Sequence, residues 1–390
     1  MESNQYVQFF DGGIEPKLET LGGKGASLVI MTSAGMPVPP GFVVTTAAFD
    51  EFMAAAGIIQ EIHDLLDGLD PEDVAQVEKV SAGIRADICS KPVPEGLRAQ
   101  TLAAYEALMG RFDTPVPVAV RSSATAEDLP DASFAGQQDT YLWLEGAKAV
   151  TEHIRQCWAS LFTSRAILYR LKNSIPNEGL SMAVVVQKMV NSKVSGVAMT
   201  LDPANGDRSK ITIDSSYGVG EMVVSGQVTP DNILLDKVTL AVVSEHLGDK
   251  HAELVPDRSA HTLVEREVEE ERRARRSLND AELAAVAAMA KRAEKHYKCP
   301  QDIEWALDAD LPDGENLLLL QSRPETVHSS KPAAPKAATG GWAAALGATG
   351  AGQAPAGGTQ AGGTPAGGTS AGAGGFSLGS ITASLLKASI

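Results

Sequence analysis

Val118-Ala-Val-Arg-Ser-Ser-Ala-Thr-Ala-Glu-Asp128 is the stretch of sequence that decides the fold. Its apolar start predicts a buried strand that places Arg121 at its end. The arginine fork suits phosphate oxygens, and a loop of small and hydroxyl residues can surround the rest of a polyphosphate with backbone N–H groups. The stretch therefore predicts a phosphate-binding loop with Ser122, Ser123 and Thr125 as further ligands. The alternative interpretation is a polar surface loop with a solvated arginine.

Composition limits the class of protein. The 390 residues are 44% apolar and 21% charged, which is ordinary for a globular protein. The net charge is −16, and residues 331–390 contain three lysines and no acidic residue, so residues 1–330 carry −19. Such a surface repels nucleic acid. We find no signal peptide, no membrane span and no paired cysteines, which together predict a cytoplasmic protein.

A glycine-rich turn precedes a helical stretch near the N-terminus. Leu21-Gly-Gly-Lys-Gly25 leads into a helix-compatible run that ends at Gly35. Such a turn is a good anion site, because its N–H groups point outward at a helix start. The spacing is not that of a Walker A motif. Alone, the motif is more typical of a plain loop.

Further strands alternate with helices along the chain. The β-branched run 181–190 predicts a buried strand, and Ile211 to Tyr217 predicts another that ends in Gly218-Val-Gly-Glu221. Glu221 suits a ribose hydroxyl, and the glycines allow close backbone approach. Residues 47–112 and 283–296 predict helices, and 147–171 predicts one helix. The charge run 263–276 predicts a solvated face.

A hairpin is predicted near residue 310. Gln301-Asp-Ile-Glu-Trp-Ala-Leu-Asp308 alternates with period two, and Leu317 to Pro324 returns as a second strand. An antiparallel pairing places Glu304 and Gln321 on one wall, where their oxygens suit magnesium. Arg323 beside them suits the charge that develops in phosphoryl transfer.

These blocks, in this order, resemble the N-terminal ATP-binding domain of the phosphoenolpyruvate synthase and pyruvate phosphate dikinase family, which the rifampicin phosphotransferases share. The resemblance covers residues 6–327 and implies a mixed α+β, ATP-grasp-type fold with two lobes. It implies that Lys24, Arg121 and Arg323 contact the phosphates of ATP. It further implies that Glu304 and Gln321 hold Mg²⁺ or Mn²⁺, and that the backbone of Gln187, Lys188, Met189 and Val190 binds adenine.

We expect four segments. Residues 1–180 would form the lobe with the phosphate-binding loops and residues 181–328 the lobe with the adenine and metal sites. Residues 329–375 are rich in Ala, Gly, Pro and Thr, which predicts a flexible, disordered linker. Residues 376–390 regain apolar character and predict a short partner-docking helix or a frayed tail.

The resemblance implies transfer of the β-phosphoryl group of ATP to a histidine, with release of AMP and phosphate. In the family that histidine lies in a further domain, and no histidine follows His328 here. We therefore expect the acceptor histidine on a partner subunit. Phenylphosphate synthases of anaerobic phenol degradation have such a separate ATP-domain chain, so phenol is the expected final acceptor. The alternatives are pyruvate as final acceptor, a fragment of a phosphoenolpyruvate synthase, and a non-catalytic nucleotide-sensing module.

Overall fold

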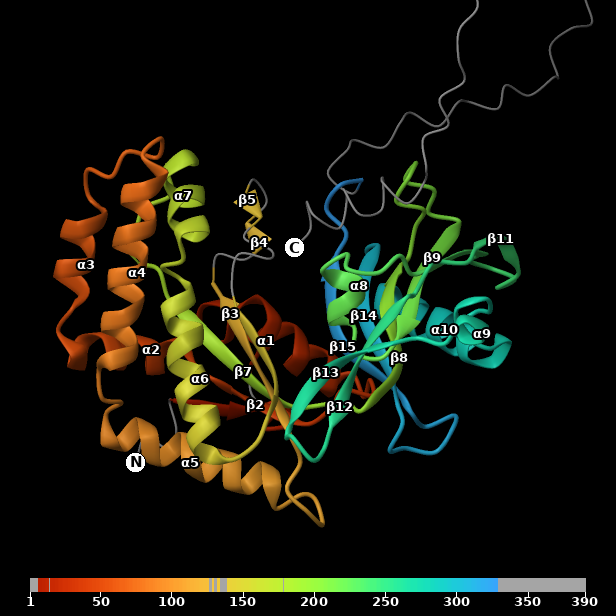
Figure 1. The fold of residues 1–390 in the computed structure, drawn as a ribbon, viewed down its shortest axis with the longest axis horizontal. Coiled ribbons are helices and arrows are strands. Elements are labelled where there is room, and N and C mark those ends of the chain that lie inside the picture. The colour runs from red at the N-terminus through yellow and green to blue at the C-terminus, as the bar shows by residue number, and fades with distance from the viewer. Residues whose placement is uncertain are drawn as a thin grey trace, which may run out of the picture.

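The chain folds into two lobes, each built around an antiparallel sheet (Figure 1). The computed structural model describes residues 6–328 apart from 14, 126–127, 130–131, 134–138 and 178. The expected mixed α+β, two-lobed fold is confirmed. The predicted linker and docking helix, residues 329–390, lie outside the described residues.

The first lobe contains a five-stranded sheet. Its spatial order is β1 (Val7–Phe9), β2 (Gly41–Val44), β7 (Met182–Lys188), β3 (Val118–Ala124) and β6 (Thr140–Leu144). Alternate residues of the central strands enter different cores: Val184 and Val186 pack on one face, and Ala183 and Val185 on the other. Because both faces of the sheet are covered, the sequences of these strands are continuous apolar runs.

Helices cover the two faces of this first sheet. One face packs against α2 (Thr46–Ala56), α3 (Ile59–Leu66), α4 (Val74–Ser90), α5 (Glu95–Met109), α6 (Ala147–Ser160) and α7 (Ser164–Lys172). The other face packs against α1 (Leu18–Ser33), which lies between the two sheets (Figure 1). The phosphate-loop candidates on α1 and β3 are therefore held against the second lobe.

The second lobe contains a six-stranded sheet. Its spatial order is β11 (Val242–His246), β10 (Asp231–Asp236), β9 (Lys210–Tyr217), β8 (Ser192–Met199), β14 (Gln301–Asp308) and β15 (Leu317–Pro324). One face packs on α10 (Asp280–Tyr297), which begins in a capping box formed by Asn279 and Glu282. The short helices α8 (Glu221–Val224) and α9 (Glu270–Arg273) complete the lobe.

Two small hairpins stand apart from the sheets. One pairs β12 (Ala252–Asp257) with β13 (Thr262–Glu267), and the other pairs β4 (Asp128–Leu129) with β5 (Ala132–Ser133). The β12–β13 hairpin lies between the two lobes in Figure 1. The His261 ring at its tip hydrogen-bonds the Glu145 carboxylate of the first lobe, Nδ1 to Oε2, at 2.6 Å.

Three details differ from the sequence-based expectations. Strand β7 lies between β2 and β3, so the chain leaves the first sheet after Lys188, beyond the expected division at residue 180. The single helix expected over 147–171 is two helices, because the Thr163 hydroxyl accepts from the Ala166 N–H and starts α7 anew. The charge run is only partly a solvated face, since Arg266 and Arg272 bind the buried Glu253 carboxylate.

No helix in residues 6–328, with the gaps given above, is long and apolar enough to span a bilayer.

Candidate functional site

A cleft of about 590 Å³ lies between the two sheets, a size typical of small-molecule sites. Both lobes line it, and it contains ten of the thirteen site residues predicted from sequence. These ten are Lys24, Arg121, Gln187, Lys188, Met189, Val190, Glu221, Glu304, Gln321 and Arg323. Residues as far apart as 24 and 323 therefore meet at one place.

Arg121 on β3 reaches across the cleft to the second lobe. One guanidinium nitrogen donates to Glu304 Oε2 at 3.1 Å and to Gln321 Oε1 at 2.8 Å. Another donates to the Leu320 carbonyl at 3.2 Å. The guanidinium therefore occupies a point on which two side-chain oxygens already converge.

The β14–β15 hairpin supplies those oxygens as predicted. Glu304 stands opposite Gln321, and Asp302 stands opposite Arg323, with Arg323 Nε donating to Asp302 Oδ2 at 2.9 Å. The register shifts directly after Glu304, which is a β-bulge of the kind that re-aims side chains beside active sites. The alternating pattern of residues 301–308 and 317–324 thus becomes one polar wall.

The glycine-rich turn is joined to β3 by a buried serine. The Ser123 hydroxyl donates to the Leu21 carbonyl at 2.8 Å and accepts from the Gly25 N–H at 3.0 Å. Gly22 has φ +65°, and a Cβ there would lie 2.0 Å from the Ser123 carbonyl oxygen. The turn and the arginine-bearing strand are therefore one unit, which carries Lys24 into the cleft.

The three predicted hydroxyl ligands do not line the cleft. The Ser123 hydroxyl is fully buried and engaged in the contacts just described, and Ser122 is buried as well. The Thr125 hydroxyl donates to the Ser181 carbonyl at 3.3 Å. Strand alternation explains Ser122, because Arg121 points into the cleft and the next side chain points away from it. Ser123 lies on the same face as Arg121 but is covered by α1. Direct nucleotide contacts from these hydroxyls are not supported by the structure.

The segment predicted to bind adenine joins β7 to the second lobe. The Lys188 N–H donates to the Pro40 carbonyl and the Met189 N–H to the Pro117 carbonyl, both at 2.9 Å. The Val190 N–H donates to no acceptor among the described residues. Val190 is therefore the backbone donor of this segment best placed for a ligand.

An apolar cluster closes this end of the cleft. Ala119, Met189 and Val219 line the cleft and pack with Trp143 of β6. The β12–β13 hairpin adds Leu254 and Leu263 to the same cluster. The wall at this end is thus made by both lobes and by the hairpin, and it suits a flat, apolar ring face.

Glu221 follows the Gly218-Val-Gly turn and lines the cleft. Burial raises the pKa of its carboxyl, the nearby Glu304 carboxylate raises it further, and Arg121 opposes the shift. The Val219 N–H donates to the Leu254 carbonyl at 2.9 Å, which fixes the turn against the β12–β13 hairpin.

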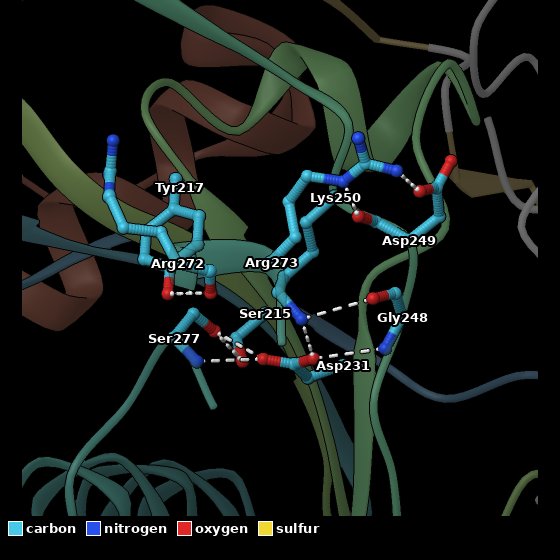
Figure 2. Close-up of polar contacts among 9 residues, drawn as sticks. All are labelled: Ser215, Tyr217, Asp231, Gly248, Asp249, Lys250, Arg272, Arg273 and Ser277. Carbon is cyan, nitrogen blue, oxygen red and sulfur yellow. Dashed lines mark hydrogen bonds and ion pairs between the residues drawn. The ribbon is translucent and has the colours of Figure 1, made fainter. Parts of the chain in front are cut away.

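A buried polar cluster holds the strands on either side of this turn (Figure 2). Asp231 at the start of β10 forms an ion pair with Lys250, and both side chains have 0% exposure. Asp231 also accepts from the Gly248 N–H at 3.0 Å and from the Ser277 N–H and hydroxyl at 2.7 and 2.9 Å. The Ser277 hydroxyl lies 2.9 Å from that of Ser215 on β9. The end of β9 and the start of β10 are therefore tied together.

The chemistry of the donor set fits a divalent cation. Glu304 and Gln321 present oxygens to one point, and Mg²⁺ usually takes one or two protein carboxylates together with phosphate oxygens. No cluster of three or more His, Cys, Asp or Glu side chains suited to a metal occurs among the residues that the structure describes. A metal held by these two residues would therefore need further ligands from a bound phosphate.

Sequence reasoning missed two carboxylates of the site. Asp302 is buried beside Arg323, and burial raises the pKa of its carboxyl while Arg323 opposes the shift. Its period-two spacing from Glu304 placed it on the same wall, which was the available signal. Asp139, which precedes β6, lines the cleft, and no motif marked it.

Comparison with known proteins agrees with this geometry. Residues 18–340 match the family described as "Pyruvate phosphate dikinase, AMP/ATP-binding domain". A probable phosphoenolpyruvate synthase of Methanothermobacter thermautotrophicus is 45% identical over 323 residues, 83% of this chain and 46% of that protein. The phosphoenolpyruvate synthase of Aeropyrum pernix is 42% identical over 80% of this chain and 41% of that protein. The chain thus spans less than half the length of these relatives.

Among solved structures, a D-alanyl-alanine synthetase A from Vibrio cholerae matches 63% of this chain and 54% of its own, with 12% identity and a TM-score of 0.25. The family match covers both lobes and every residue of the cleft. The chain belongs to the family of pyruvate phosphate dikinase AMP/ATP-binding domains.

Proposed function

We propose that this chain binds Mg²⁺–ATP in the cleft and donates the β-phosphoryl group to a histidine on a partner subunit. One observation carries the proposal: Arg121, Glu304 and Gln321 meet at a single point between the lobes. A cationic fork and two oxygen ligands at one point match the needs of a metal-bound polyphosphate.

Each side chain has a role that its position supports. Lys24, Arg121 and Arg323 clamp phosphate oxygens and stabilise the charge that develops during transfer. Glu304 and Gln321 hold the metal, which when bound neutralises phosphate charge. Glu221 accepts from the ribose hydroxyls, and the base lies on the apolar cluster beside Val190.

The position of the histidines supports an acceptor outside this domain. All seven histidines fall between residues 63 and 328, within the described part of the chain, and none lines the cleft. In the proposed transfer the histidine nitrogen attacks the β-phosphorus, and AMP leaves with the α,β-bridging oxygen. Water then attacks the γ-phosphorus and breaks its bond to the β,γ-bridging oxygen, so phosphate leaves with one oxygen from water and the β-phosphoryl group stays on the histidine. The relatives' greater length agrees with a further domain that carries the acceptor.

For the final acceptor we propose phenol, which would be converted to phenylphosphate as in the phenylphosphate synthases. The names of the relatives favour a second candidate, pyruvate, which would be converted to phosphoenolpyruvate.

Label transfer tests both the proposed transfer to a partner polypeptide and the identity of the final acceptor. The purified chain, Mg²⁺ and β-labelled ATP are added to host extract, and proteins are resolved on a gel that preserves phosphohistidine. We expect β-label on a second polypeptide, no label there from γ-labelled ATP, and no transfer by the Glu304→Gln variant. Chase with phenol or pyruvate then identifies the acceptor that removes the label.

Two outcomes contradict the proposal. Label on this chain itself would place the acceptor here. ATP binding without any labelled protein would favour a nucleotide-sensing module.

A further inference from the structure

A second hollow, of about 680 Å³, lies on the second lobe between the C-terminal half of α10 and the loop that precedes β9. Its cations are Arg208, Lys291, Arg292, Lys295 and Lys298, and we call it the basic groove. One acidic residue, Glu294, also lines it, and that carboxylate already binds Lys237 at 3.0 Å. The groove is therefore a positive surface on a chain whose net charge is −16.

The cations of the basic groove differ from most others in the protein. None of the five forms an ion pair with a carboxylate of the described residues, whereas the cations elsewhere in the second lobe mostly do. Lys291 and Arg292 instead donate to backbone carbonyls. Arg208, Lys295 and Lys298 are exposed, and their side-chain nitrogens have no hydrogen-bond partner among these residues. Their charges are available to a ligand.

Local folding does not account for this set of side chains. Cations near a helix C-terminus interact favourably with its dipole, which explains Lys295. Arg208 comes from a loop outside the helix. Lys298 occupies the cap position with φ +59°, where glycine is the favoured residue. The groove thus retains a lysine at a position where the backbone favours another residue.

We propose that the basic groove docks an acidic segment of a protein partner. Lys291, Lys295 and Lys298 lie on one helical stripe that spans about 10 Å. Carboxylates three or four residues apart on a partner helix have a matching spacing. No cation of the groove is fully buried, which argues against a site for a small anion.

The surrounding charge argues against nucleic acid. A nucleic acid strand extends its phosphates well past a stripe of this length. Beyond the groove those phosphates would meet a chain whose net charge is −16, and charges within about 8 Å of one another are only partly screened at physiological salt. A short acidic protein segment meets the groove without that repulsion.

Fluorescence polarisation of a labelled helical peptide with Glu at positions i, i+4 and i+7 tests the proposal, with the Gln peptide as control. We expect salt-sensitive binding of the Glu peptide to the full chain. The double substitution Lys295→Glu and Lys298→Glu should weaken binding of the Glu peptide at least tenfold. The matched reversal Lys148→Glu with Lys172→Glu, on exposed sites of the first lobe, should change it less than twofold.

The milder pair Lys295→Gln with Lys298→Gln guards against a folding defect, and unchanged Mg²⁺–ATP binding in all variants confirms an intact cleft. Equal weakening by both charge reversals would overturn the proposal, because only net charge would then matter. Displacement of the peptide by inorganic phosphate, or tighter groove-dependent binding of a single-stranded oligonucleotide, would overturn it as well.

Discussion

Replacing Lys250 by methionine tests the buried cluster around Asp231. Lys250 and Asp231 are both fully buried, and removing one partner of such a pair costs about 3–5 kcal/mol, because the other charge is left uncompensated. In Lys250→Met the Asp231 carboxylate keeps three donors, from Gly248 and Ser277. We therefore expect a loss near the lower end, about 3 kcal/mol in the free energy of unfolding.

The reverse change should cost more. In Asp231→Ala the Lys250 ammonium keeps one acceptor, the Gly248 carbonyl at 3.1 Å, and the Ser277 groups lose theirs. We expect about 5 kcal/mol. Arg98→Ala breaks the exposed pair with Glu95 and serves as control, with an expected loss below about 0.5 kcal/mol.

Urea denaturation followed by tryptophan fluorescence measures these free energies of unfolding. The slope of the free energy against urea concentration, the m-value, is compared between variants. A loss below about 1 kcal/mol for Lys250→Met would refute the reasoning, since the pair would then contribute no more than a surface pair. So would a larger loss for Lys250→Met than for Asp231→Ala.

Four further predictions concern the cleft and the buried residue Asp214. Arg323→Ala should lower turnover in the label-transfer assay on the order of 100-fold while the variant still folds, with some loss of stability because the buried Asp302 loses its partner; near-normal AMP production would exclude Arg323 from the mechanism. ATP affinity should fall as pH falls through the raised pKa of Glu221, because the ionised form accepts from ribose, and Glu221→Gln should remove that dependence in titration calorimetry. Mn²⁺ should bind weakly without nucleotide, because the Arg121 guanidinium occupies the oxygens of Glu304 and Gln321 that would bind the metal. Arg121→Ala should therefore strengthen nucleotide-free Mn²⁺ binding measured by electron paramagnetic resonance, and an unchanged affinity would contradict this. Burial raises the pKa of Asp214 to about 6, so stability should fall as pH rises from about 4 to 6, and Asp214→Asn should remove the fall, on the order of 3 kcal/mol by chemical denaturation.

The sequence predicted the parts of the site that repeat with a simple period. The alternation at 301–308 and 317–324 predicted the hairpin and the pairing of Glu304 with Gln321, both confirmed by the register. Arg121 was found because it follows an apolar run, although β3 does not end there as predicted but continues to Ala124. These features depend on neighbouring residues, so local pattern is enough to find them.

Features that depend on tertiary contacts were not predictable in this way. Ser123 looks like a ligand in the sequence, but packing of α1 against β3 directs its hydroxyl to Leu21 and Gly25. The place of β7 between β2 and β3 also depends on long-range pairing. Strand β13 was hidden at the start of the charge run, because it is largely exposed and carries no apolar alternation.

The β12–β13 hairpin has a mechanical consequence for the protein. It extends from the second lobe, adds Leu254 and Leu263 to the apolar cluster with Trp143, and bonds the first lobe through His261 (Figure 1). The lobes are therefore joined at the hairpin, along α1, whose apolar side chains share one core with the second sheet, and through the polar contacts of Arg121. Separation at the hairpin or along α1 would expose apolar surface to water. A charged ligand can replace the Arg121 contacts without that cost, so the cleft can change there while the lobes stay packed.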